Sequence, residues 1–422
     1  MSTISRLLES VPIPRLVPVR QSYERPRLAD PGASFVSALR SRGVLDRIED
    51  GHRIAIAVGS RGVENLPLFV KLTVEEIRRS GGKPFIFPAM GSHGGATAEG
   101  QKSLLEGMGV TEETVGAPIR ATMEVVQIGT SENGLPVYLD KFADEADGIV
   151  LINRVKPHVG FRGPFESGIM KMIAIGVGKQ KGAETCHNLG FGTMAENLPA
   201  IGRVFLEKRN LLWATALVEN AYHETCMIEV LKSAEIEDRE PALQQEAKRL
   251  SPRLHFPSLD VLILDEIGKD ISGTGFDTNV VGRFHTPYAS GGPDITRMAV
   301  LDLTEKSHGN ANGVGILDFT TRRLFDKMDF EQTYPNSLTS TVPTSVKVPM
   351  VLHNDREAIQ AAIKTCNISD VNQVRLVRMK NTLSTDRIWA SETLLAEIAS
   401  HDSLEIDGAP ACLEFDAEGN LF

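Results

Sequence analysis

The sequence has little of what a secreted, membrane-spanning or nucleic-acid-binding protein needs. Only 4 of its 422 residues are cysteines, and no two of them form a CxxC pair, which excludes a disulfide scaffold and favours a reducing compartment. No apolar run approaches the roughly 18 residues of a membrane-spanning helix, so we expect no membrane partner. Lys and Arg number 45 against 55 Asp and Glu, and a net charge of −10 offers no general attraction to nucleic acid.

What remains is an ordinary globular composition, 41% hydrophobic and 24% charged, in a chain long enough for two or three domains. The first twenty or so residues carry charges and prolines where a secretory signal would be apolar, so we expect a cytoplasmic location. Strands alternate with helices from residue 53 onward, which is typical of parallel sheets covered by helices. The predicted strands are 53–58, 84–88, 148–153, 211–219, 260–265, 298–304, 314–320 and 373–380, and the predicted helices include 66–80, one ending near residue 107, 233–250 and 355–365.

A segment with two prolines, 251–258, marks a domain boundary near residue 255. We therefore predict an α/β protein of two domains, 1–255 and 256–422, each with a mostly parallel, helix-covered sheet. Ligands of open α/β sheets bind at the carboxyl ends of strands, and we expect the active site in the cleft between the domains. The final segment could pack back on the first domain. The charged segment 233–250 is interpreted as a solvated helix.

Three predicted strands end in loops rich in glycine and polar residues, 59–62, 91–95 and 153–163. Glycines let a backbone approach a ligand closely, and the helix N-termini that follow such loops favour anions. One loop of this kind is more often a simple turn. Three loops at the same sheet edge favour a binding site.

His93 and His158 each lie in one of these loops. Imidazole is the natural proton-transfer group near neutral pH, whereas a lone histidine is more often structural. For two histidines expected at one sheet edge, a catalytic pair and a structural role are about equally good interpretations. Ser92 and Arg162, in the same two loops, are candidate ligands of a cofactor and of a substrate, respectively.

Lys171 interrupts an apolar run, where a charged ammonium is costly to bury. Either its side chain reaches solvent, or it is neutral or chemically modified. His187 follows 16 positions later, and on one continuous helix the two side chains would point to nearly opposite sides. Glycines at 176, 178 and 182 break that helix, so the two can still converge on one ligand. The intervening string GVGKQKG is not a P-loop, because it lacks the required spacing and no Ser or Thr follows the lysine.

A further polar, glycine-containing loop, 266–279, follows the predicted strand that ends at Asp265. Lys269, with Arg283 nearby in sequence, could hold a substrate carboxylate across an interdomain cleft. A surface loop with solvated charges is an equally good interpretation.

These segments resemble the nickel-dependent lactate racemase superfamily, and in particular its relatives that carry a lactate racemase N-terminal domain. The resemblance rests on three stretches of sequence. They are GSHGGATAEG around His93, NRVKPHVGFRGPFESGIMKMIAIGVGKQKGAETCH from 153 to 187, and KDISGTGFDTNVVGR from 269 to 283.

The resemblance implies that Lys171 attaches covalently to a nickel-pincer nucleotide, a mononucleotide whose pyridinium ring bears two sulfur arms that hold Ni(II). It implies that His187 completes the nickel coordination, which suits a square-planar ion with one in-plane position left open. His93 and His158 correspond to the acid/base pair of the family. Arg61 would help to hold the nucleotide phosphate, and Lys269 would aid substrate binding.

The implied activity is racemisation or epimerisation of a small 2-hydroxy acid by proton-coupled hydride transfer, with the cofactor supplied by dedicated biosynthetic enzymes. Two alternatives stay open at this point. One is a cofactor-binding protein without racemase activity, in which the two loop histidines are structural. The other is a nickel-independent α/β enzyme of the same fold.

Overall fold

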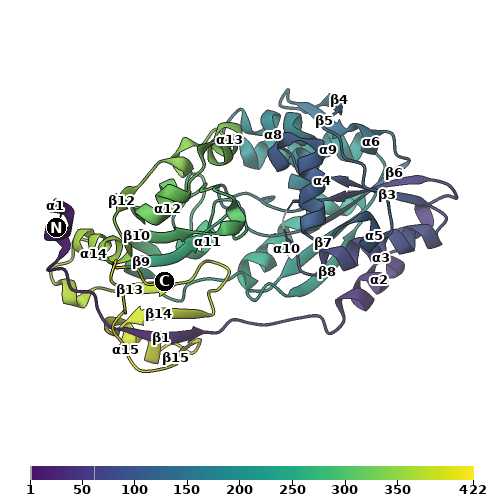
Figure 1. Ribbon diagram of the computed structural model, residues 1–422. Coiled ribbons are helices and arrows are strands. Elements are labelled where there is room, and N and C mark those ends of the chain that lie inside the picture. The colour runs from purple at the N-terminus through teal and green to yellow at the C-terminus, as the bar shows by residue number, and fades with distance from the viewer. Residues whose placement is uncertain (1, 61) are drawn as a thin grey trace. The chain divides into compact units, whose positions relative to one another are not determined.

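The computed structural model describes residues 2–60 and 62–422, which fold into two compact units. The first unit is Glu24–Ser251, and the second unit combines the residues up to Tyr23 with Pro252–Phe422 (Figure 1). Among the described residues, no helix has both the length and the apolar composition needed to cross a membrane.

The first unit is built on a five-stranded sheet in the order β3-β2-β6-β7-β8, and a β4–β5 hairpin lies beside it. Strands β3, β2, β6 and β7 are parallel, and β8 is antiparallel to β7. The strands are β2 (Arg53–Val58), β3 (Lys83–Pro88), β4 (Val125–Thr130), β5 (Pro136–Asp140), β6 (Gly148–Arg154), β7 (Leu211–Glu219) and β8 (Thr225–Leu231). The helices are α2 (Pro31–Ser41), α3 (Leu66–Arg79), α4 (Ala98–Gly107), α5 (Glu112–Val115), α6 (Lys141–Asp144), α7 (Ile169–Lys171), α8 (Lys179–His187), α9 (Met194–Lys208) and α10 (Ile236–Leu250).

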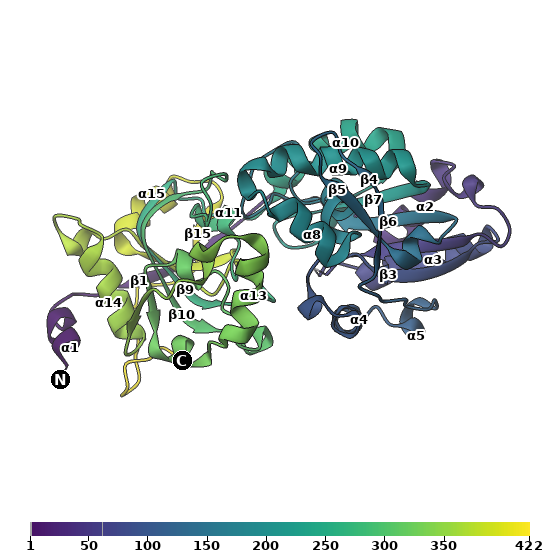
Figure 2. The same ribbon diagram turned by 90° about the horizontal axis from the view of Figure 1, so that it is seen from above.

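Helices cover both faces of this sheet, with α2 and α3 on one and α10 on the other (Figure 2), and α7 packs against β6 and β7. β2 reads RIAIAV, and every residue after Arg53 is buried, as expected for a strand packed on both faces. α3 ends at the predicted stop signal, because Gly81 adopts a φ of 87° and Gly82 donates its N–H to the carbonyl of Ile77 at 3.0 Å. Since β2, β3 and β6 are parallel, the three glycine-rich loops leave the same edge of the sheet.

The second unit contains an eight-stranded sheet in the order β12-β11-β10-β9-β13-β14-β1-β15. The neighbouring strands β12, β11, β10, β9 and β13 are parallel to one another, and the pairs β13–β14, β14–β1 and β1–β15 are antiparallel. The strands are β1 (Leu16–Gln21), β9 (Ser258–Ile267), β10 (Asp294–Leu303), β11 (Phe319–Thr321), β12 (Met350–Leu352), β13 (Leu376–Met379), β14 (Arg387–Ser391) and β15 (Leu404–Ile406). The helices are α1 (Thr3–Leu8), α11 (Thr278–Val281), α12 (Arg322–Lys327), α13 (Phe330–Ser340), α14 (Asp355–Thr365) and α15 (Leu395–Ala399).

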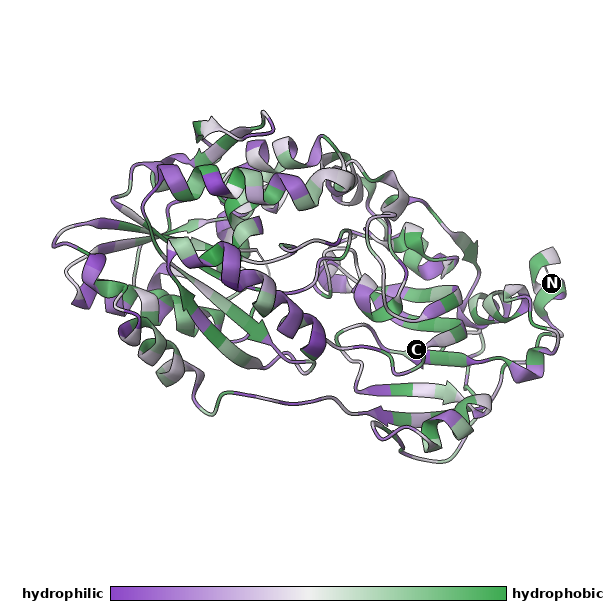
Figure 3. Cartoon of the chain, turned by 180° about the vertical axis from the view of Figure 1, so that it is seen from behind, coloured by the Kyte–Doolittle hydropathy of each residue, from purple (hydrophilic) through white to green (hydrophobic). Residues whose placement is uncertain are grey.

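Alternate residues of the central strand β9 enter two different cores. Val261 and Ile263 pack with α14, whereas Leu262 and Leu264 pack with α11 and α15. A strand that is apolar on both faces therefore reads as a continuous apolar run, and the central strands of both units are largely green in Figure 3.

The N-terminal segment requires a correction to the predicted domains. The sequence-based division places it in the 1–255 domain, whereas β1 lies in the sheet of the second unit between β14 and β15 (Figure 1). Pro18 conceals this strand, since proline is rare inside sheets. The carbonyl of Pro18 accepts the N–H of Asp407 at 2.8 Å. The N–H that proline lacks would point to the same side of the strand, toward residues that follow the paired part of β15, so the sheet accommodates the proline there.

Two smaller predictions are also corrected. The predicted strand 314–320 is wrong in its first half, because Val314–Ile316 forms a 3₁₀ turn and β11 begins at Phe319. Gly315 permits this turn, since a Cβ atom there would lie 2.3 Å from the carbonyl oxygen of Thr344. The final segment of the chain belongs to the second unit, not to the first.

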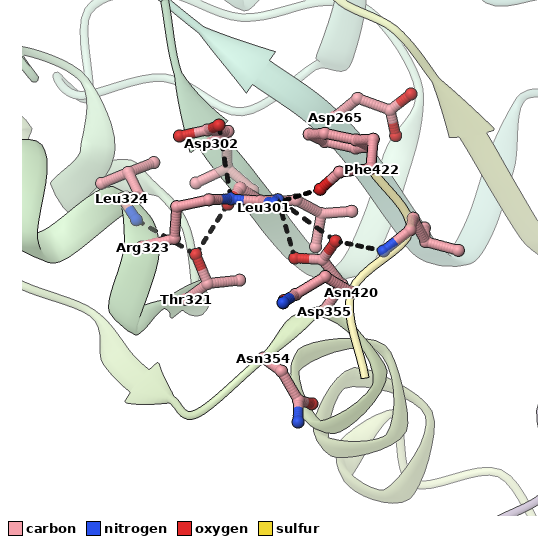
Figure 4. A network of polar contacts seen from close by, with 12 residues as sticks. Asp265, Leu301, Asp302, Thr321, Arg323, Leu324, Asn354, Asp355, Asn420 and Phe422 are labelled. Atoms are coloured by element: carbon pink, nitrogen blue, oxygen red, sulfur yellow. Dashed lines mark hydrogen bonds and ion pairs between the residues drawn. The ribbon is translucent and has the colours of Figure 1, made fainter. Parts of the chain in front are cut away.

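Arg323, the second residue of α12, holds this final segment at the carboxyl edge of the second sheet (Figure 4). Its guanidinium donates to both oxygens of Asp355 at 3.0 and 3.1 Å and to the carbonyl of Phe422 at 2.6 Å. Asp355 is fully buried and also accepts the backbone N–H of Leu421 at 2.8 Å. Arg323 is therefore the cation that compensates a buried carboxylate.

We expect the substitution Arg323→Met to lower the free energy of unfolding by about 3 kcal/mol, because it leaves the Asp355 carboxylate buried without its cation. The adjacent Arg322→Met is the matched control, since the Arg322–Asp326 pair is exposed and should contribute less than about 1 kcal/mol. Urea unfolding of both variants measures the difference. Equal midpoints for the two variants would contradict this role of Arg323.

Candidate active site

The loops that follow β2 and β3 pack against one segment of the chain, residues 168–183. The backbone N–H of Gly91 donates to the carbonyl of Gly176 at 3.1 Å. A Cβ atom placed on Gly59 would lie 3.2 Å from Cε of Met172. The glycines thus allow both loops to approach this segment closely, as expected from the sequence.

Lys171 lies where the short helix α7 passes into a π turn, Met172–Gly176. The N–H of Val177 closes this turn on the carbonyl of Met172 at 2.9 Å, an i→i+5 hydrogen bond. The start of α7 is tied to the end of β6, because the side-chain amide of Asn153 donates to the carbonyl of Gly168 at 2.7 Å. Turns of this kind are found frequently at functional sites.

The positive charge of Lys171 affects two side chains of α8, Cys186 and His187. Burial, assisted by that positive charge, lowers the pKa of His187 to about 4. Burial raises the pKa of the Cys186 thiol to about 12, and the same ammonium opposes this shift. The imidazole at 187 is therefore neutral, which is the form that binds a metal.

His187 has the properties of a ligand in a second respect. Its Nδ1 atom is buried and makes no hydrogen bond to any residue within 2–60 and 62–422. A buried polar atom normally has a partner, so an orphaned imidazole nitrogen fits a position intended for a metal ion. Lys171 is half-buried, and its neighbours in sequence, Met170 and Met172, are buried.

Phe191 connects His187 to His158. Its ring stacks on His187 with centroids 5.5 Å apart and lies 5.9 Å from the ring of His158. His158 also packs on Phe161 at 4.5 Å. The structure thus brings the predicted metal ligand and one predicted acid/base residue into a single aromatic cluster.

The backbone around His158 fixes the state of its ring. Nδ1 accepts the N–H of Gly160 at 3.0 Å, so a neutral ring carries its proton on Nε2. The N–H of His158 donates to Glu166 at 2.8 Å, and Arg162 donates to the carbonyl of His158 at 2.7 Å. Arg162, expected to bind substrate, therefore also orders the loop that carries His158.

His93 is held in the corresponding loop after β3. Its Nδ1 forms a hydrogen bond with the hydroxyl of Ser60, which comes from the loop after β2. The side chain of Gln101 donates to the carbonyls of Gly91 and His93 at 2.9 and 3.2 Å. Ser92 is half-buried in the same loop. Arg61, expected to contact the nucleotide phosphate, lies outside the described residues.

Lys179 is a buried residue that the sequence analysis passed over. It adopts a left-handed φ of 55°, and its ammonium lies 3.0 Å from Asp140, which is also fully buried. The same ammonium donates to the carbonyl of Pro88 and, at 3.1 Å, to the side chain of Gln101. Burial lowers the pKa of Lys179 and raises that of Asp140, while their mutual attraction opposes both shifts. Because Gln101 also holds the His93 loop, this cluster connects α8 to that loop.

Lys269 lies in the second unit, in the loop after β9. The Lys269 ammonium donates to the carbonyl of Gly273 at 2.7 Å, and the backbone N–H of Lys269 donates to the hydroxyl of Ser307 at 2.7 Å. Arg283 forms an ion pair with Asp318 at 2.6 Å. The structure thus places both cations within the second unit, and the role expected of Lys269 in substrate binding stays a prediction.

The segment predicted as a solvated helix, 233–250, has a buried polar face. Glu240 and Gln244 of α10 are fully buried. The signal that could have revealed them is the set Glu240, Leu243, Gln244 and Ala247, whose i, i+3, i+4, i+7 spacing places all four on the inward face of the helix.

Comparisons with known proteins agree with this architecture. Residues 15–198 match the family model described as lactate racemase N-terminal domain. A structure of the lactate racemase apoprotein from Thermoanaerobacterium thermosaccharolyticum is similar with a TM-score of 0.54, covering 88% of this chain and 99% of that chain at 12% identity. A comparison with curated proteins found no significant match.

The fold is thus that of an α/β protein with two mixed, mostly parallel sheets, and it is lactate racemase-like. Residues 15–198 are similar to the lactate racemase N-terminal domain family. Both findings confirm predictions made from the sequence. At 12% identity, the likeness to the solved structure concerns the fold.

We expect Lys179→Met to lower the free energy of unfolding by about 3 kcal/mol or more, because the Asp140 carboxylate would remain buried without its cation. Adding Asp140→Asn should restore part of this loss, since the uncompensated charge is then removed. Lys181→Met, on the exposed side of the same helix, is the matched control and should change stability by less than about 0.5 kcal/mol. Urea unfolding monitored by circular dichroism measures all three variants, and wild-type stability of Lys179→Met would refute the role assigned to the pair.

Proposed function

We propose that this protein is a racemase or epimerase of a 2-hydroxy acid that works with a nickel-pincer nucleotide bound covalently at Lys171. The match of residues 15–198 to the lactate racemase N-terminal domain model supports the class of activity. The observation that carries the proposal is the buried Nδ1 atom of His187, which makes no hydrogen bond within residues 2–60 and 62–422, next to the aromatic cluster that contains His158.

The donor set suits such a cofactor. Lys171 would hold it through an amide-type bond, and His187 would give the nickel ion a neutral imidazole nitrogen. Arg61 and Ser92 are our candidates for contacts to the nucleotide. When bound, the cofactor supplies a hydride acceptor for the carbon that carries the substrate hydroxyl.

The loop histidines supply the proton chemistry. A base must take the hydroxyl proton as the substrate carbon loses hydride, and inversion requires such a group for each enantiomer. Nε2 of His158 would face the substrate, because the backbone N–H of Gly160 occupies Nδ1. For Nε2 to take a proton, the Gly160 hydrogen bond must open and the neutral ring must carry its proton on Nδ1 instead. His93 has its Nδ1 bound to Ser60, which orients its ring in the same way.

The remaining roles concern the substrate and the supply of the cofactor. Arg162 and Lys269 are our candidates for binding the substrate carboxylate, since each presents a cation held in place by backbone carbonyls. The cofactor would come from biosynthetic enzymes, which are therefore the expected protein partners.

We expect the protein to gain the mass of the cofactor when it is produced together with the cofactor-making enzymes. Intact-mass spectrometry should show the adduct in the wild type and not in Lys171→Arg, because a guanidinium cannot form the amide-type bond. In His187→Ala the adduct should persist while the nickel content falls by about tenfold or more, since a metal ligand is lost. Lys181→Arg is the control and should keep both. An adduct that survives in Lys171→Arg would overturn the proposal.

We expect the loaded wild type to interconvert the enantiomers of at least one short-chain 2-hydroxy acid, as measured by chiral chromatography. His93→Ala and His158→Ala should each slow the interconversion by roughly 10²- to 10⁴-fold without loss of the adduct, because each removes one proton-transfer group. His52→Gln is the control, since His52 precedes β2 at the opposite edge of the same sheet. An adduct without interconversion would instead identify a cofactor-binding protein, and interconversion without nickel would identify a nickel-independent enzyme.

A further inference from the structure

One face of α10 is directed at the irregular segment 157–171, which carries both His158 and Lys171. Three polar side chains on this face follow one another at intervals of four residues, and all three contact the segment. They are Glu240, Gln244 and Lys248. This spacing places them in one row along the helix.

Glu240 acts on the start of the helix that carries Lys171. Its carboxylate accepts the backbone N–H of Met170 at 2.9 Å and is fully buried. Gly168 precedes this helix, and a Cβ atom on it would lie 2.1 Å from Oε1 of Glu240. The carboxylate therefore caps the N-terminus of α7 from outside, in a space that only glycine leaves open.

Gln244 acts on the middle of the segment through its whole side-chain amide. Its oxygen accepts the N–H of Glu166 at 2.6 Å, and its nitrogen donates to the carbonyl of Gly163 at 2.9 Å. Both contacts are to backbone groups in a stretch without helix or strand, where such groups need partners from elsewhere.

Lys248 completes the row through the buried carboxylate of Glu166. Its ammonium lies 2.6 Å from one oxygen of Glu166, and the other oxygen accepts the N–H of His158 at 2.8 Å. Arg162 lies 3.4 Å from the same carboxylate. The contact between α10 and His158 thus passes through one buried anion.

We propose that Glu240, Gln244 and Lys248 are positioning residues, which hold His158 and Lys171 in a fixed relation by attaching the 157–171 segment to α10. The part of this inference that concerns the catalytic roles of His158 and Lys171 rests on the proposed function. A solvated helix would need none of these contacts, and a purely structural helix would direct apolar side chains at the sheet and leave the loop to solvent. Here the row of polar side chains satisfies the backbone of the loop itself.

Hydrogen exchange followed by mass spectrometry tests the positioning in the protein without cofactor. Gln244→Ala and Lys248→Met should each accelerate amide exchange in the 157–171 segment by about fivefold or more, because each removes a buried hydrogen-bond partner of that segment. Exchange in β2 and β6 should stay at the wild-type rate. Lys248→Arg should restore slow exchange, since a guanidinium can replace the ammonium beside Glu166.

Two neighbours on the exposed side of the helix are matched controls, Gln245→Ala and Arg249→Met, and both should exchange as the wild type does. Wild-type exchange of the 157–171 segment in Gln244→Ala and Lys248→Met would overturn the inference. Equal acceleration throughout the first unit would also overturn it, because the residues would then support overall stability.

Loading with the cofactor adds a second measurement. In Lys248→Met the fraction of chains with the Lys171 adduct should fall, and kcat should decrease more than KM increases, with Lys248→Arg close to the wild type. If the wild type itself carries no adduct, the proposed function fails, and the exchange experiment still decides whether α10 orders the segment. If the wild type is loaded and Lys248→Met is equally loaded and equally active, the positioning role fails while the proposed function stands.

Discussion

The site depends on main-chain segments that approach one another too closely to leave room for side chains. A Cβ atom on Gly176 would lie 2.7 Å from the carbonyl oxygen of Ala89, and one on Gly91 would lie 3.2 Å from Ile175. The loop after β3 is therefore placed against the 168–183 segment by backbone contact. As a result, the positions of Lys171 and His93 are determined mainly by the path of the main chain, and less by their own rotamers.

The irregular parts of the site are nevertheless ordered, because buried charged groups supply the hydrogen bonds that helices and strands would otherwise make. Lys179 with Asp140 does this below the His93 loop, and Glu166 with Lys248 does it below the His158 loop. Each loop thus has one buried ion pair and one side-chain amide, Gln101 or Gln244, that reaches its carbonyl groups. This repeated solution places catalytic candidates on loops and still gives them a rigid support.

Much of the first unit could be predicted because its strands are apolar on both faces and end at turn-forming residues. Arg53–Val58 is followed by Gly59 and Leu211–Glu219 by Asn220, and both strands have the predicted bounds. β1 could not, since Pro18 masks a strand whose partners are more than 350 residues away. The sequence pattern did not fix the relation between Lys171 and His187. The path of the chain between them depends on a π turn and on the left-handed backbone of Lys179, and neither has a recognisable sequence pattern. The buried side chains of α10 escaped notice because their partners lie 70 to 82 residues earlier in the chain.

The π turn at Met172–Gly176 limits how the length of this segment can vary. It contains one residue more per turn than an α-helix, and removing that residue would rotate Lys171 by roughly 100° about the helix axis relative to His187. Single-residue insertions and deletions should therefore be absent here among relatives that use both side chains.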